Sequence, residues 1–171
     1  KQAGFKRINA DVIYGLPGQT MASLKETLAR LCSTDIEHLS VYGLIVEDGT
    51  PLQKMTEAGQ IILPDEDEAA DMYEFVQEFL KMQGFERYEI SNYARGKAYS
   101  RHNLVYWHYY PYAAFGAGAC GFNGSARFTA AAKVQNYIQL IQSGGQLYDK
   151  EELPVPVQFE EFMFMNLRKK S

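Results

Sequence analysis

The order strand, helix, strand in the first 47 residues constrains the fold of this chain more than any other feature. INADVIYGLPG (8–18) is a short apolar run closed by glycines and a proline, which is typical of a buried strand followed by a turn. MASLKETLARLC (21–32) has leucines at helical spacing, and EHLSVYGLIVE (37–47) is a second apolar, β-branched run. This order predicts a parallel strand pair with a crossover helix, and therefore an α/β fold.

The rest of the chain predicts further helices, one strand and two loops. LPDEDEAADMYEFVQEFLKMQGF (63–85) begins with the capping pattern of Asp65 and Glu68 and predicts a helix that ends at Gly84. Apolar spacing or β-rich composition predicts three more elements: a strand at 86–94 and helices at 130–145 and 157–171. Segments with turn residues predict two loops: 47–54 and 146–158.

Composition narrows the classes of function. The chain has 171 residues, of which 46% are hydrophobic and 22% charged, as in a globular domain. A net charge of −4 argues against a general nucleic-acid binder. No run approaches about 18 apolar residues, so we expect no membrane span and membrane contact only through partner proteins. Cys32 and Cys120 are too few for a structural zinc or an iron–sulfur cluster, and sparse cysteine predicts a reducing, cytoplasmic location.

An aromatic and glycine-rich segment, SRHNLVYWHYYPYAAFGAGACGF (100–122), allows two interpretations. It is either an aromatic core strand beside a tight turn or the wall of a pocket for a large flat ligand. Its glycines at 116–121 match dinucleotide-binding spacing, but no acidic residue follows about 20 positions later, so we reject a Rossmann site. We expect these glycines to let the backbone pass close to a ligand or to another strand.

Two polar positions are the strongest candidates for a binding site. Asp11 interrupts the first strand near its predicted carboxyl end, where ligands gather in α/β folds. It either accepts hydrogen bonds from a ribose or an amine, or caps a backbone turn. His102 either binds haem iron as a neutral imidazole or forms a hydrogen bond within a strand–loop junction, and its chemistry alone favours the second interpretation.

Weaker candidates surround these two. The backbone amides of GLPGQT (15–20) either meet an anion or belong to a plain strand-to-helix turn, which is favoured. Arg127 either holds a ligand carboxylate or makes a surface salt bridge. Glu89 and Ser91 are expected to share one strand face that lines a cleft or faces water. His38 precedes a strand and is expected to be exposed.

Six motifs, taken in order, resemble one family. NADVIYGLPGQT, HLSVYGLIVEDGTPL, YEISNYA, HNLVYW, FGAGACGF and a later arginine and tyrosine are similar to motifs of oxygen-independent coproporphyrinogen III oxidase and its radical S-adenosylmethionine relatives. YEISNYA and HNLVYW resemble the haem-chaperone, HemW-like branch. The resemblance spans essentially the whole chain.

The resemblance implies an architecture and a set of cofactors. Residues 1–128 would form the C-terminal part of a partial (β/α) barrel, and residues 129–171 the truncated start of a helical domain. The family uses S-adenosylmethionine and a [4Fe–4S] cluster held by a C-x-x-x-C-x-x-C motif, which is absent here. Lys1 in place of a methionine, the unpartnered final helix and the missing motif lead us to expect a fragment whose cluster ligands lie elsewhere.

The resemblance also assigns roles to residues. Position by position, it assigns S-adenosylmethionine contacts to Asp11, Ile13, Ile45 and Phe122, and haem binding, as an iron ligand, to His102. It implies a chaperone that binds haem and delivers it to recipient haemoproteins.

Two alternatives stay open, so whether the protein is an enzyme also stays open. One is an oxidase that decarboxylates porphyrinogen propionates, although the oxidase proper departs from HNLVYW. The other, for the isolated chain, is an inactive half-barrel. Its open sheet edge would favour self-association or poor solubility.

Overall fold

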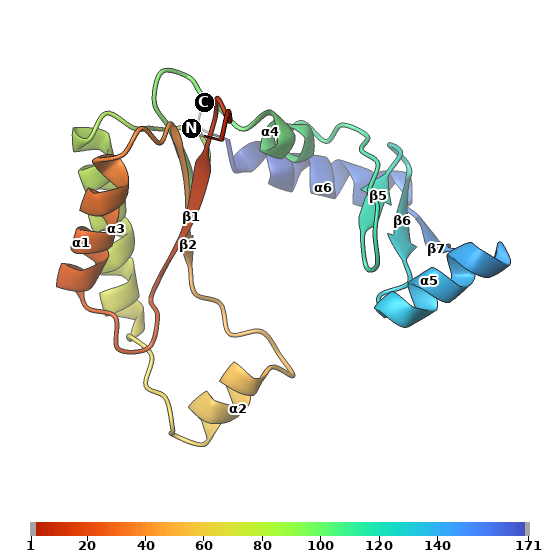
Figure 1. Cartoon of the computed structure of the whole chain (residues 1–171), viewed down its shortest axis with the longest axis horizontal. Coiled ribbons are helices and arrows are strands. Elements are labelled where there is room, and N and C mark those ends of the chain that lie inside the picture. Colours follow the sequence, from red (N-terminus) through yellow and green to blue (C-terminus); the bar gives the residue numbers. More distant parts are fainter. Residues whose placement is uncertain (1–2, 170–171) are drawn as a thin grey trace. The chain divides into compact units, whose positions relative to one another are not determined.

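The computed structural model describes residues 3–169 and contains two compact units, which divide between residues 99 and 100 (Figure 1). The first unit is a four-stranded sheet with helices, and the second is a three-stranded sheet with helices. The chain is therefore a mixed α/β protein. The domain boundary expected between residues 128 and 129 stays a prediction.

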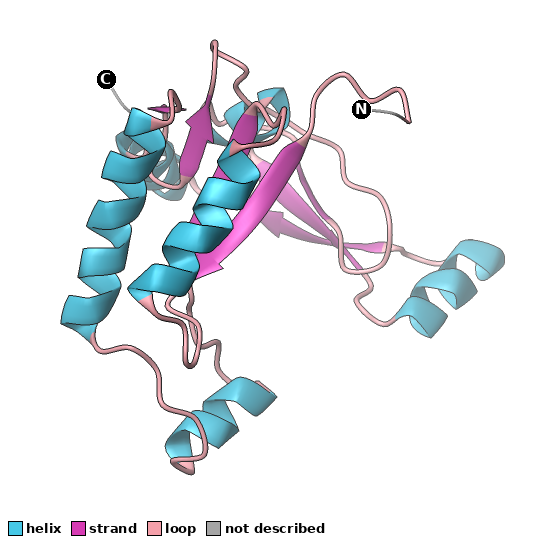
Figure 2. Ribbon diagram, turned by 60° about the vertical axis from the view of Figure 1, so that its left-hand side comes forward, coloured by secondary structure: helices cyan, strands magenta, loops and turns pink. Residues whose placement is uncertain are grey.

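The first unit confirms the predicted parallel pair. Strands β1 (Asn9–Tyr14) and β2 (His38–Gly43) run parallel and are joined by α1 (Met21–Cys32). The sheet order is β1-β2-β4-β3, with β4 (Asn92–Ala94) antiparallel to both β2 and β3 (Glu86–Arg87). Figure 2 shows this sheet beside its long helices. One crossover helix thus joins the parallel pair β1 and β2, as expected.

Helices α1 and α3 (Glu66–Met82) cover one face of this sheet, on the same side of β1 and β2 in Figure 1. The core that joins them consists of apolar side chains from both layers: Val12, Leu39 and Val41 from the strands, Leu24 and Leu28 from α1, and Val76 and Leu80 from α3. Each such buried side chain contributes about 1.5–3 kcal/mol of transfer free energy. The alternation of side chains along β1 and β2 therefore places the other residues of both strands on the face opposite these helices.

Two expectations about local structure in this unit are wrong. Helix α2 (Pro51–Glu57) lies in the predicted loop 47–54 and buries none of its residues, so no apolar stripe announces it. Its signal is Thr50, whose hydroxyl accepts a hydrogen bond from the Gln53 N–H at 3.2 Å, followed by a proline. The predicted strand 86–94 is instead two short strands joined by a turn, with Glu86 opposite Ala94.

Glu89 explains the turn between β3 and β4. Its carboxylate accepts hydrogen bonds from the Ser91 N–H at 3.0 Å and from Asn92 Nδ2 at 2.6 Å. The side chain is only 1% exposed. Glu89 therefore holds the chain reversal from inside, and it neither lines an open cleft nor faces water.

The second unit is built on an antiparallel sheet in the order β5-β6-β7. Its elements are three strands and three helices: β5 (Cys120–Phe122), β6 (Ala126–Ala130), β7 (Tyr148–Glu152), α4 (Arg101–Trp107), α5 (Val134–Ser143) and α6 (Val155–Leu167). The predicted helices at 130–145 and 157–171 are confirmed as α5 and α6 over the described residues. The predicted loop at 146–158 is wrong, because β7 is a charged edge strand whose last four residues are exposed.

The aromatic segment begins as a helix and not as a strand. Ser100 caps α4 by accepting a hydrogen bond from the Asn103 N–H at 3.2 Å. The interpretation as one aromatic core strand is wrong, as is the strand–loop junction expected at His102. The expected close backbone passage is confirmed at Gly121, where an added Cβ would lie 3.2 Å from the carbonyl oxygen of Tyr112. No helix among residues 3–169 is long and apolar enough to cross a membrane.

Candidate functional site

A row of polar side chains lies on the face of the four-stranded sheet that α1 and α3 do not cover. The strand register places Asn9 beside His38, and Asp11 beside Ser40. Ser40 also pairs with Asn92 of β4. Because paired residues point to the same face of a sheet, these side chains share the face opposite α1 and α3. These five residues define the polar row.

Hydrogen bonds within the polar row lead to its one exposed carboxylate, that of Asp11. The Tyr88 hydroxyl lies 2.6 Å from His38 Nε2, and His38 Nδ1 lies 2.6 Å from Asn9 Oδ1. Asn9 Nδ2 in turn donates to Asp11 Oδ1 at 2.5 Å. Ser40 Oγ adds a longer contact of 3.4 Å to Asn9 Oδ1. These contacts therefore lead from the buried Tyr88, outside the row, to the solvent-facing carboxylate of Asp11.

His38 is not exposed as expected, because only 5% of it is accessible to solvent. Both of its ring nitrogens are within hydrogen-bond distance of a partner. Burial lowers the pKa of His38, and the charge of Asp11 opposes this effect without reversing it. The imidazole is therefore neutral at neutral pH.

Asp11 lies in the middle of β1 and not near its carboxyl end, since it is the third residue of Asn9–Tyr14. Its side chain is exposed, and its partner is the side-chain amide of Asn9. The turn-capping interpretation is not supported, because this contact is not made to a turn amide. Asp11 offers an accessible, acceptor-only group on an otherwise partly covered surface.

Two predicted S-adenosylmethionine contacts of the first unit are exposed apolar residues. Ile13 is 44% exposed and follows Asp11 on the same face of β1. Ile45 is 74% exposed and lies two residues beyond the end of β2. A carboxylate flanked by an exposed isoleucine on one strand face suits a ligand with both hydrogen-bond donors and an apolar group.

The turn after β1 is closed by its own chain. Gln19 Oε1 accepts hydrogen bonds from the N–H groups of Gly15 at 2.8 Å and Leu16 at 3.3 Å. Gln19 Nε2 donates to the Ile13 carbonyl at 3.2 Å. Gly15 takes a φ of 78°, which favours glycine. The plain strand-to-helix turn is confirmed, and the anion-binding interpretation of these two amides is wrong.

In the second unit, His102 lies in the first turn of α4 and is exposed. Its Nε2 is 3.1 Å from the Tyr106 hydroxyl, and the two rings meet edge to face with centroids 5.1 Å apart. A histidine that binds iron through Nε2 would exchange this hydroxyl contact for the metal. The haem role of His102 stays a prediction.

Phe122, the remaining predicted S-adenosylmethionine contact, is 5% exposed and lies in an aromatic core. Its ring centroid is 4.7 Å from that of Tyr109 and 6.1 Å from that of Tyr112. A cavity of about 260 Å³ adjoins it and is lined mainly by aromatic and small residues: Tyr112, Ala114, Phe115, Gly121, Phe128 and Tyr148. The glycine-rich half of the aromatic segment therefore does line a cavity, although the cofactor role of Phe122 stays a prediction.

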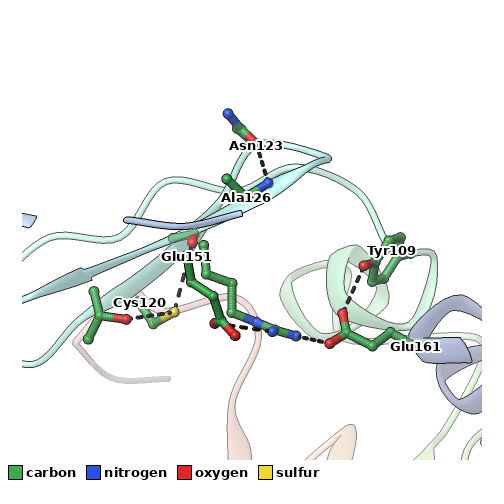
Figure 3. Close-up of polar contacts among 9 residues, drawn as sticks. Tyr109, Cys120, Asn123, Ala126, Glu151 and Glu161 are labelled. Carbon is green, nitrogen blue, oxygen red and sulfur yellow. Dashed lines mark hydrogen bonds and ion pairs between the residues drawn. The ribbon is translucent and has the colours of Figure 1, made fainter. Parts of the chain in front are cut away.

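Arg127 is held by two carboxylates of the same unit (Figure 3). Its Nη2 lies 2.5 Å from Glu161 Oε1, and its Nη1 lies 3.6 Å from Glu151 Oε2. The Tyr109 hydroxyl donates to Glu161 Oε2 at 2.8 Å. Burial and this hydrogen bond raise the pKa of Tyr109 to about 12. The salt-bridge interpretation of Arg127 is confirmed, and both arms of its guanidinium already have partners.

Metal ligands do not gather in the described part of the chain. Among residues 3–169, no group of three or more His, Cys, Asp or Glu side chains is arranged to hold a metal ion. Cys32 is buried and Cys120 is half-buried, and both are free thiols. These residues do not fit the ligand set of an iron–sulfur cluster.

Sequence reasoning missed Asn9, Ser40 and Tyr88. The available signal was the repeated polar residue at alternate positions of two otherwise apolar strands, Asn9 and Asp11 in one, His38 and Ser40 in the other. Alternation of this kind places a polar set on one strand face.

Comparison with curated proteins gives relatives over nearly the whole chain. No family model matches. A protein named Heme chaperone HemW from Bacillus subtilis is 41% identical over 170 residues, which are 99% of this chain and 45% of that protein. The protein of the same name from Lactococcus lactis is 37% identical over 171 residues, with 100% and 45% covered. The chain thus spans about 45% of the length of these relatives.

A mitochondrial relative and a solved structure extend the comparison. Radical S-adenosyl methionine domain-containing protein 1 of Danio rerio is 37% identical over 115 residues, covering 67% of this chain and 26% of that protein. The structure of coproporphyrinogen III oxidase (HemN) from Escherichia coli, described as a radical SAM enzyme, superposes with a TM-score of 0.76 at 20% identity. It matches 98% of this chain and 42% of its own length, which shows similarity of fold alone.

Proposed function

The chain belongs to the family of HemW haem chaperones and HemN-like radical S-adenosylmethionine proteins, and on this premise we propose that it is part of a haem chaperone. The intact protein would bind haem and S-adenosylmethionine and deliver haem to recipient haemoproteins. The observation that carries the proposal is the similarity to two bacterial haem chaperones across the full chain, at 41% and 37% identity. The exposed carboxylate of Asp11, on the sheet face opposite α1 and α3, supports the cofactor part of it.

S-adenosylmethionine would bind on the polar face of the four-stranded sheet. Asp11 would accept hydrogen bonds from the ribose hydroxyls or the amine of the cofactor, and Ile13 and Ile45 would supply apolar contact. Phe122 is the remaining proposed contact. The cofactor, with an iron–sulfur cluster whose ligands lie outside the described residues, supplies one-electron chemistry when bound.

Haem would bind at His102. An exposed imidazole on a helix is a suitable axial ligand for haem iron. Tyr106, whose hydroxyl contacts the same ring, would lie beside the bound porphyrin. We place the protein in the cytoplasm, with haemoproteins as partners.

The proposed architecture follows the same family. Residues 1–128, with the parallel pair β1 and β2, would be the C-terminal portion of a partial (β/α) barrel and its extension, and residues 129–171 the truncated start of the helical domain. The similarity of fold to the oxidase structure, with a TM-score of 0.76, supports this arrangement.

A haem titration tests the proposal. Haem is added to the intact protein that contains this segment and to its His102→Ala variant, and the Soret band is recorded. His108→Ala is the matched control, because His108 ends the same helix and its Nδ1 contacts the Leu104 carbonyl at 2.7 Å. We expect loss of the histidine-dependent band only in His102→Ala.

The same preparation separates the chaperone from the second candidate function. A coproporphyrinogen III oxidase would release carbon dioxide from the propionate side chains of coproporphyrinogen without added haem. The oxidase is the second candidate because its structure shares the fold of this chain, which does not decide the activity, whereas the names of the bacterial relatives favour the chaperone. If the isolated chain shows no haem binding and no decarboxylation, that result would support the inactive half-barrel.

A further inference from the structure

The hydrogen bonds of the polar row can run in only one direction. A carboxylate accepts hydrogen bonds and does not donate them, so Asn9 must turn its Nδ2 toward Asp11. The Asn9 Oδ1 then faces His38 Nδ1 at 2.6 Å. An oxygen acceptor at this distance requires a proton on Nδ1. The charge of Asp11 therefore sets the tautomer of His38 on the neighbouring strand, through the side chain of Asn9.

The direction continues to a buried tyrosine. A neutral imidazole that is protonated on Nδ1 has an acceptor at Nε2. The Tyr88 hydroxyl, 2.6 Å from this nitrogen, is then the donor. Along these three contacts the donors run from Tyr88 to His38, from His38 to Asn9, and from Asn9 to Asp11. The opposite tautomer would place a ring nitrogen lone pair against Asn9 Oδ1.

Packing holds the start of this relay in place. Tyr88 is 8% exposed, and its ring stacks on that of Tyr99 with centroids 4.4 Å apart. The rings of Tyr88 and His38 meet edge to face at 5.6 Å. The buried end is rigid in these contacts, whereas the Asp11 end is exposed to solvent.

We propose that Tyr88 and His38 are positioning residues for the ligand-binding carboxylate of Asp11. By fixing the amide of Asn9, they hold Asp11 Oδ1 and leave Oδ2 for a donor of the ligand. The inference rests on the proposed function, in which Asp11 binds S-adenosylmethionine. It adds that the Tyr88 hydroxyl and the His38 imidazole influence the affinity for the cofactor without having to touch it.

The test measures S-adenosylmethionine affinity by calorimetry in the intact protein with its cluster. Asp11→Asn tests the proposed function and is expected to weaken binding by about tenfold or more, as for loss of a charged hydrogen-bond acceptor. Tyr88→Phe removes the hydroxyl that holds His38 at Nε2. It is expected to weaken binding by about threefold to tenfold, because the imidazole is then no longer held in position against Asn9. Tyr93→Phe is the matched control, since Tyr93 is 1% exposed and lies on the opposite face of the sheet.

A histidine pair keeps the test decisive if Tyr88→Phe does not fold. His38→Asn retains a donor near the position of Nδ1, and His38→Leu removes it. We expect affinity within about twofold of wild type for His38→Asn and a loss of about tenfold for His38→Leu. ¹⁵N NMR of the labelled imidazole should report the Nδ1–H tautomer in wild type and also in Tyr88→Phe, because Asn9 and Asp11 still require it.

The outcomes separate the inference from the proposed function. If Asp11→Asn weakens binding but Tyr88→Phe and His38→Leu do not, the relay is overturned and Asp11 remains a ligand contact. If Asp11→Asn binds like wild type, the cofactor role of Asp11 and the relay fall together. Equal losses in Tyr88→Phe and Tyr93→Phe, or an Nε2–H tautomer in wild type, would also overturn the relay.

Discussion

The two units differ in whether their charged side chains are paired with opposite charges. In the first, a chain of neutral groups ends at the exposed carboxylate of Asp11. In the second, Arg127 lies between two carboxylates and Glu161 also receives a tyrosine hydroxyl. An open chain of hydrogen bonds has an acceptor left for a ligand, whereas a closed charge network has satisfied its own groups.

This contrast shows why a conspicuous cluster of charges is not by itself a binding site. The Arg127 network contains more charged groups than the polar row, and the side chain of Arg127 is 31% exposed. Its partners come from β7 and α6, so it ties strand β6 to two later elements of the unit. The polar row contains one charge, and that charge faces solvent. We therefore expect the network to contribute to stability and the row to binding.

The largest expected effect concerns the state of the isolated chain. Strand β1 is an edge of its sheet, and an unpaired edge invites pairing with another chain. The second unit offers a different surface, the exposed apolar side chains of α6 such as Phe164, which is 69% exposed. We expect sedimentation to show concentration-dependent self-association that Phe164→Glu leaves in place.

Two results would alter this interpretation. A compact monomer at micromolar concentration would contradict self-association. Association that disappears in Phe164→Glu would move the contact from the sheet edge of the first unit to the helix of the second.

Loss of the cation from the Arg127 network is expected to have the next largest effect. Arg127→Met leaves Glu161, whose side chain is 21% exposed, with its charge uncompensated by the guanidinium. We expect a loss of about 2 kcal/mol in the free energy of unfolding, measured by urea denaturation. Glu151→Gln is the control, because this 67% exposed partner should contribute at most about 1 kcal/mol. Equal losses in both variants would show that the network is not centred on Glu161.

The predictability of the fold from sequence differs between regions for a physical reason. The strand–helix–strand start was predictable because the sheet and its helices bury side chains between them. This burial imposes apolar spacing on Val12 of the strand and on Leu24 and Leu28 of α1. Helix α2 and strand β7 were not, because they bury few or no side chains and so carry no such spacing. Their signals are local, a threonine–proline cap and an edge strand of charged residues.

The candidate site was predictable only in part. Asp11 is recognisable as a carboxylate in an apolar strand, whereas Asn9 and Tyr88 gain their roles from contacts that only the folded chain creates. The hydrogen bond between His38 and Tyr88 joins residues 50 positions apart. The expected exposure of His38 was wrong for this reason, since its partners come from β1 and from the turn before β4.

A pH titration sharpens the contrast through His38. Burial lowers the pKa of this imidazole in the folded chain, whereas in the unfolded chain it takes a proton near the usual value of about 6.5. The unfolded state therefore binds more protons between these two values, and stability rises with pH there. We expect the free energy of unfolding to be highest above about pH 6.5 and to fall as pH drops below it. His38→Asn should show a smaller fall over the same range, and an identical profile would show that His38 does not titrate on unfolding.

The smallest expected effect is the most informative one for the comparison. Asp11→Asn removes the charge at the open end of the row while keeping the shape of an exposed side chain. We expect the free energy of unfolding to change by at most about 0.5 kcal/mol, as for most surface substitutions. Glu161→Gln is the matched change in the closed network and should cost more, because the amide weakens the contact to Arg127. If Asp11→Asn destabilises the chain as much as Glu161→Gln, the Asp11 carboxylate is a structural group like Glu161. The two units would then use their charges alike, and the polar row would offer no free acceptor to a ligand.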